Sequence, residues 1–177
     1  MSIAIRELDA ARGPTDALAA LLVEVTASGA SVGFMHPLAP QRAREWWRNA
    51  LADAAHGSRI VFGAFEGEAL AGTVTLYLAL PENQPHRAEI MKLQVGLAFR
   101  RRGVGELLMR AAEARAAALG RSVLVLDTAS DDARRLYERL GWTKVGDVPD
   151  YALYPNGEPC ATTIYWKRLD VTADRSA

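Results

Sequence analysis

The chain has 177 residues, and its 21 Lys and Arg balance 21 Asp and Glu. This length suits one domain, which we place at residues 1–170, with 171–177 as a C-terminal tail. The zero net charge argues against nucleic acid or an acidic membrane as a partner. Cys160 is the only cysteine, which excludes an intrachain disulfide. Because no apolar run approaches the roughly 20 residues of a membrane helix, we expect a cytoplasmic protein. We also expect a monomer or a homodimer.

In the first half of the chain, apolar alternation predicts a short strand near residues 3–8. Helical periodicity then predicts helices over 17–27 and about 41–55, separated by a glycine-containing break. Three runs rich in β-branched residues follow between 59 and 95, with turn residues between them. This pattern is typical of an antiparallel meander.

In the second half, the hydrophobic period becomes helical from Gly103 and ends at Gly120. Further elements are predicted in this order: a strand over 122–126, a helix over 131–140 capped by Ser130 or Asp131, and strands over 142–148 and 162–167. A strand, a helix and a strand in direct succession indicate a parallel or splayed strand pair. We therefore predict an α/β (α+β) domain with a mixed, mostly antiparallel sheet flanked by helices.

The segment 93–108 combines a strand, a basic turn and the start of an amphipathic helix. A helix start binds phosphate well because its first N–H groups are unpaired and carry partial positive charge. Gly103 and Gly105 would let the backbone approach such an anion. Three arginines precede them: Arg100, Arg101 and Arg102. The alternative reading of the arginines is a solvated charge cluster or a nucleic-acid patch. The glycines do not match a dinucleotide-binding fingerprint, which needs a third glycine, or a P-loop, which needs a lysine followed by serine or threonine.

Two ordered motifs resemble those of the GNAT superfamily of N-acetyltransferases. Arg100, Gly103 and Gly105 fit its R/Q-x-x-G-x-G/A pattern, and residues 133–142 resemble its second motif, A-x-x-L-Y-E-x-x-G-F. Over about residues 29–169 the chain is most similar to the tabtoxin-resistance branch of these enzymes. The segments that carry this narrower likeness are 29–35, 126–128, 145–151 and 163–167.

The resemblance implies acetyl-coenzyme A as co-substrate and an amine of a small molecule as acceptor. Members of the tabtoxin-resistance branch acetylate an amino-acid-like β-lactam toxin, although substrates change readily among relatives. The implied cofactor-binding residues are Leu93, Val95, Arg100, Arg101, Arg102, Gly103, Val104, Gly105 and Ser130. In this reading the strand backbone at 93 and 95 binds the pantetheine arm, and the turn binds the pyrophosphate.

Three residues are catalytic candidates. Tyr137, in the second motif, is implied as the acid that protonates the leaving thiolate, or else it is a core aromatic. Glu89 stands where some members keep a glutamate base, and simple alternation puts it on one strand face with Met91, Leu93 and Val95. Its alternative is a satisfied polar residue. Asp127 follows a buried strand at the point where the splayed strands should open, and it is either a base or amine ligand or a turn cap.

Phe34, Trp46 and Tyr151 are candidates for the acceptor pocket, although each could equally be a core residue. The three histidines show no metal-ligand spacing, so we predict no metal. A rival reading is a non-catalytic module that senses acyl-coenzyme A. Among enzymes, protein N-termini and polyamines stay open as acceptors.

Overall fold

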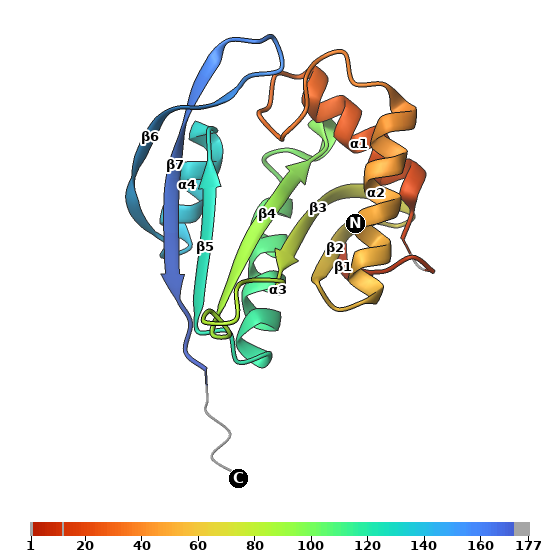
Figure 1. Ribbon diagram of the computed structural model, residues 1–177. Helices are drawn as coiled ribbons and strands as arrows, with labels where there is room; N and C mark the ends of the chain where they lie inside the picture. Colours follow the sequence, from red (N-terminus) through yellow and green to blue (C-terminus); the bar gives the residue numbers. More distant parts are fainter. Residues whose placement is uncertain (1, 12, 172–177) are drawn as a thin grey trace.

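The computed structural model describes residues 2–11 and 13–171 (Figure 1), so most of the predicted tail, 172–177, lies outside the described residues. Within them, the strands form one sheet in the order β1-β2-β3-β4-β5-β7-β6. Neighbouring strands are antiparallel except for the parallel pair β4 and β5. The predicted fold class is confirmed. The strands are β1 (Ile3–Leu8), β2 (Arg59–Glu66), β3 (Ala69–Tyr77), β4 (Arg87–Val95), β5 (Val123–Thr128), β6 (Thr143–Leu153) and β7 (Pro159–Arg168).

Helices cover both faces of this sheet (Figure 1). They are α1 (Thr15–Ala27), α2 (Pro40–Ala55), α3 (Val104–Ala118) and α4 (Asp131–Arg139), with a short 3₁₀ turn η1 (Leu97–Phe99) before α3. On one face, α1 and α2 bury a cluster that includes Leu18, Leu22 and Trp47. On the other, α3 buries Leu108 and Met109 in a second cluster that α4 also joins. Apolar burial on two faces therefore fixes the sheet between two helical layers.

The parallel pair is short. β4 and β5 pair only at Arg87 with Val123, Ala88 with Leu124 and Glu89 with Val125. Beyond these positions the two strands diverge, as Figure 1 shows. The predicted splayed pair is therefore present, and it opens a gap in the middle of the sheet.

A β-bulge interrupts β4 beside this gap. Gln94 faces Thr73 and Met91 faces Thr75, so β4 holds one residue more than β3 between these pairs. Lys92, at the bulge, has the left-handed φ of 55°. Because the extra residue inverts the alternation, Leu93 and Val95 pack on the α3 side with Ile90. The expectation that they share a face with Glu89 was wrong, since it assumed an unbroken strand.

The last strands extend beyond the predicted limits. β6 continues to Leu153 although it contains Gly146 and Pro149, both of which interrupt a strand pattern. It is one of the two edge strands of the sheet, where a proline can be placed without loss of a ladder hydrogen bond. Its register with β7 shifts twice, between Lys144 and Gly146 and between Val148 and Ala152. None of the helices in the described part of the chain has the length and apolar character of a membrane span.

Candidate active site

A cleft of about 1160 Å³ lies where β4 and β5 separate. It extends from the start of α3, past the ends of β4 and β5 and the side of α4, to the loop 28–35 and the β6–β7 hairpin. The loop and the hairpin meet above it. The N–H of His36 donates to the Pro155 carbonyl at 3.0 Å, and Ser31 Oγ donates to the Leu153 carbonyl at 3.4 Å. The cleft is thus bordered by segments far apart in sequence.

One end of the cleft has the features expected of an anion site. Gly103 is the residue before α3 and has φ 78°, and no side chain caps the helix. The first N–H groups of α3 are therefore left for a ligand. A Cβ on Gly103 would meet nothing within 4 Å, so the space beside it is open. Gly105 is different, because its Cβ would lie 3.1 Å from Leu136 Cδ2 of α4.

The three arginines do not act alike. Arg100 and Arg101 line the cleft, and Arg101 has the left-handed φ of 60°. Arg102 is instead ion-paired with Glu66 at the end of β2 and lies 5.3 Å from the Phe99 ring centroid. The pairing with Glu66 thus keeps one arginine away from the cleft. Only two of the three predicted arginines border it.

The edge of β4 that faces β5 is unpaired along the cleft. Leu93 and Val95 line this wall, whereas pairing with β5 ends at Glu89. Backbone groups of an unpaired strand edge can hydrogen-bond an extended ligand, as an added strand would. This arrangement suits a linear chain that contains amides.

Asp127 lies on the other wall. It belongs to β5 itself, faces Ile164 in the register with β7 and lines the cleft. Thr162 Oγ1 donates to its Oδ2 at 2.7 Å, which orients the carboxylate. The turn or capping role that the sequence left open for Asp127 falls to other residues, because Thr128 Oγ1 accepts the N–H of Ser130 at 3.1 Å and Ser130 itself caps α4. The carboxylate of Asp127 is therefore placed for contact with a ligand.

Tyr137 lies on α4, is 4% exposed and lines the same cleft. Its ring centroid is 6.0 Å from that of Trp142 and 5.9 Å from that of Tyr165. Burial, and then the negative charge of Asp127, raise the pKa of Tyr137, so it stays a neutral proton donor at physiological pH. Tyr137 is thus packed in the core and also borders the cleft, so its burial does not exclude the catalytic role.

Glu89 is not brought to this site. It lies where β4 and β5 still pair, its carboxylate is 2.9 Å from Arg87, and it is absent from the cleft lining. Asp127 and Tyr137 are thus the two catalytic candidates that border the cleft together.

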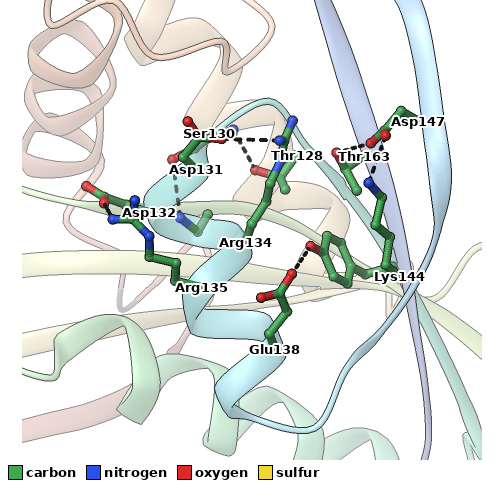
Figure 2. A network of polar contacts seen from close by, with 12 residues as sticks. Thr128, Ser130, Asp131, Asp132, Arg134, Arg135, Glu138, Lys144, Asp147 and Thr163 are labelled. Atoms are coloured by element: carbon green, nitrogen blue, oxygen red, sulfur yellow. Dashed lines mark hydrogen bonds and ion pairs between the residues drawn. The ribbon is translucent and has the colours of Figure 1, made fainter.

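Polar contacts hold α4 in place beside the cleft, as Figure 2 shows. Ser130 caps the helix by accepting the N–H of Ala133 at 3.3 Å, and it also lines the cleft. Glu138 accepts the hydroxyl of Tyr165 at 2.8 Å, which attaches the helix to β7. Burial and this carboxylate raise the pKa of Tyr165 to about 12. The position of Tyr137 therefore depends on bonds at both ends of its helix.

The acceptor-pocket candidates separate. Phe34 and Tyr151 line the cleft, Phe34 from the loop after α1 and Tyr151 from the β6–β7 hairpin, where it is 56% exposed. Trp46 does not border the cleft. It packs edge-on against Phe34, with ring centroids 5.9 Å apart, and so supports the wall from behind.

One cleft residue escaped the sequence analysis. Lys92 lines the cleft and is half-buried. Its ammonium donates to the Val32 carbonyl and lies 5.5 Å from the Phe34 ring centroid. The available signal was a lysine inside an otherwise apolar strand, a position where this residue is rarely buried without a partner. As for metals, the described residues contain no group of three or more His, Cys, Asp or Glu that could hold an ion.

Comparisons with known proteins agree with this geometry. A family described as "Acetyltransferase (GNAT) family" matches residues 22–142. Among solved structures, a GNAT superfamily phosphinothricin acetyltransferase from Sinorhizobium meliloti, in complex with acetyl-coenzyme A, superposes with a TM-score of 0.82 at 16% identity, covering 100% of this chain and 94% of that one. The Salmonella typhimurium protein yncA, with its cofactor acetyl-coenzyme A, gives 0.78 at 19% identity over 100% and 99% of the two chains.

An N-acetyltransferase from Staphylococcus aureus Mu50 gives a TM-score of 0.80 at 15% identity, with coverage of 96% of this chain and 100% of that one. At these identities the structural likeness supports the fold alone. The family assignment depends instead on the family match, which covers residues 22–142. The chain belongs to the GNAT acetyltransferase family.

Proposed function

We propose that the protein transfers the acetyl group of acetyl-coenzyme A to a primary amine of a small molecule. The observation that carries this proposal is that one cleft is lined by an uncapped helix start, an open strand edge, a carboxylate and a buried phenol. These features suit, respectively, the pyrophosphate, the pantetheine arm and the reacting thioester of the co-substrate.

The residues at the α3 end of the cleft fit the phosphate part of acetyl-coenzyme A. The free N–H groups of α3 and the side chains of Arg100 and Arg101 supply donors and positive charge for the pyrophosphate. Glu106 also lines this end, but its carboxylate is 2.9 Å from Arg110, which offsets its charge. We assign the backbone at Leu93 and Val95 to the pantetheine arm, and Ser130 to the wall opposite it.

Asp127 is our candidate for the base. An alkylamine with a pKa near 10 is mostly protonated at neutral pH, so it must lose a proton before its lone pair can attack the thioester carbon. A carboxylate oriented by Thr162 at 2.7 Å can accept that proton directly or through a water molecule. Glu89 is the weaker candidate, because Arg87 holds it outside the cleft.

The C–N bond forms as the C–S bond breaks, and two groups balance the charges. A backbone N–H near Val95 is proposed to stabilise the negative charge that develops on the carbonyl oxygen. Tyr137 is proposed to give its proton to the leaving sulfur, and the phenolate so formed takes the second proton, which the nitrogen loses after its attack. The hydroxyl of Tyr137 makes no hydrogen bond to any residue in the described ranges, so it is available to a ligand.

For the acceptor we favour an amino-acid-like molecule, in line with the sequence resemblance to the tabtoxin-resistance branch. The contact between the loop 28–35 and the β6–β7 hairpin above the cleft also favours a small acceptor over a polypeptide. Phe34 and Tyr151 are the proposed wall residues for it.

The test is release of free thiol from acetyl-coenzyme A across a panel of amino acids, β-lactam amino acids, polyamines and peptide N-termini. We expect turnover with a subset of the small amines. Tight binding of acetyl-coenzyme A without turnover of any amine would instead favour the non-catalytic sensor.

A further inference from the structure

Lys92 borders the cleft and forms no ion pair with any of the residues that the structure describes. Its ammonium group has three N–H donors, and the described residues offer it one acceptor, the Val32 carbonyl. The rings of Phe34 and Trp46 lie nearby, with centroids at 5.5 and 5.2 Å. Such ring faces attract a cation but accept no proton from it. Two donors are therefore left for something that enters the cleft.

The burial of this charge has a cost that the protein alone does not offset. Desolvation lowers the pKa of Lys92, while the negative charge of Asp127 opposes this shift. A partly buried ammonium gains most from an anion that pairs with it and accepts its free donors. The same interaction shows that Lys92 and Asp127 lie close enough in the cleft to influence one another.

The backbone directs this side chain. Lys92 occupies the left-handed region, φ 55°, at the bulge of β4. A lysine in this region is strained, and such strain persists where the surrounding structure imposes it, often at functional sites. The bulge inverts the alternation of the strand, and Lys92 then reaches Val32 in the loop after α1.

We propose that Lys92 selects the acceptor by binding an acidic group of it, so that the acceptor is a small amine that also carries a carboxylate or a comparable anion. Its amine end lies toward Asp127 and its acidic end toward Lys92. This inference rests on the proposed function in one respect, that the cleft takes an amine acceptor. Lys92 acts as a specificity residue and takes no part in the transfer of the acetyl group.

The experiment compares acids with their amides. The probes are L-amino acids and phosphinothricin, each beside the matching compound in which the acidic group is a neutral amide or ester. We expect the wild-type enzyme to favour the acid in kcat/KM by about 10- to 100-fold, the range of a hydrogen bond to a charged group. Lys92→Gln should remove this preference through KM, with the neutral probes changed less than about twofold.

Two further variants guard against a structural explanation. Lys92→Gly suits the positive φ, so the bulge should fold even if the glutamine variant does not. Arg42→Gln removes another cation from the Phe34 ring, 5.9 Å away, on an exposed residue that does not border the cleft, and it should keep the acid preference. Equal loss for acids and amides in both Lys92 variants, or no preference in the wild type, would overturn the proposal.

Calorimetry in the presence of coenzyme A separates this proposal from the proposed function, because it needs no turnover. Acids that bind in a Lys92-dependent way but are never acetylated would uphold the acid site and reject the transferase. Acetylation of amides and acids at equal rates would uphold the transferase and reject the acid site.

Discussion

The two ends of the cleft are built in different ways. At the end proposed for phosphate, the groups available to a ligand are main-chain N–H groups and neighbouring side chains within residues 100–105. At the acceptor end, Phe34, Lys92, Asp127 and Thr162 come from four distant segments and meet only in the folded sheet. A local anion site can stay the same while the distant segments change, which suits a family with one co-substrate and many acceptors.

The largest expected effect is at the phosphate end. Gly103→Val should weaken binding of acetyl-coenzyme A by about 100-fold or more, because valine is strained at φ 78° and its methyl groups would occupy the open space beside the helix start. Gly120→Val is the matched control, since Gly120 has φ 73° and also no atom within 4 Å of a Cβ, but lies after the end of α3. Calorimetry should show unchanged affinity in the control, and unchanged affinity in both would refute our phosphate site.

At the acceptor end, Asp127→Asn should lower turnover by about 100-fold or more while the affinity for the cofactor is kept. The amide oxygen can still accept the hydrogen bond of Thr162, so the geometry survives and the proton acceptor is lost. The remaining rate should then follow the fraction of free amine and fall most steeply at low pH. Glu89→Gln, outside the cleft, serves as comparison. If both variants keep the wild-type pH profile, neither carboxylate is the base.

Between the two ends, Tyr137→Phe should reduce the rate of a single turnover by roughly 100-fold or less, because a thiolate is a tolerable leaving group even without an acid. Ring packing against Trp142 and Tyr165 is kept, so folding and cofactor affinity should change little. Tyr165→Phe removes a neighbouring hydroxyl that bonds Glu138 instead of facing the cleft. It weakens one attachment of α4 but keeps the phenol of Tyr137, so it should reduce the rate by less than about tenfold. A fast Tyr137 variant would make this tyrosine a core residue only.

The same contrast explains what the sequence could predict. Glycines, a basic turn and a helix start are local features, so an anion site could be proposed from residues 100–105 alone. The three arginines look equivalent in the sequence, yet Arg101 has a positive φ and Arg102 pairs with Glu66 of β2. That difference depends on backbone conformation and on a distant strand, which the local pattern of residue types does not specify.

The acceptor end was predicted less completely because its geometry depends on pairing between strands. The bulge at Lys92 exists only relative to β3, where one residue of β4 has no counterpart. The bond between Thr162 and Asp127 depends on the register of β5 and β7. Sequence predicted Asp127 near the opening of the sheet, but its partner and the lysine across from it required the assembled structure.

The short pairing of β4 with β5 has a consequence for hydrogen exchange. Past Glu89, amide groups on the facing edges of these strands lack a partner strand, so they should exchange with solvent faster than those between β2 and β3. A bound pantetheine chain would take the place of the absent neighbour and slow that exchange. The sheet would then behave as two cooperative units, which the bound co-substrate joins into one. The binding energy of the co-substrate would appear as added protection against exchange along the facing edges of β4 and β5.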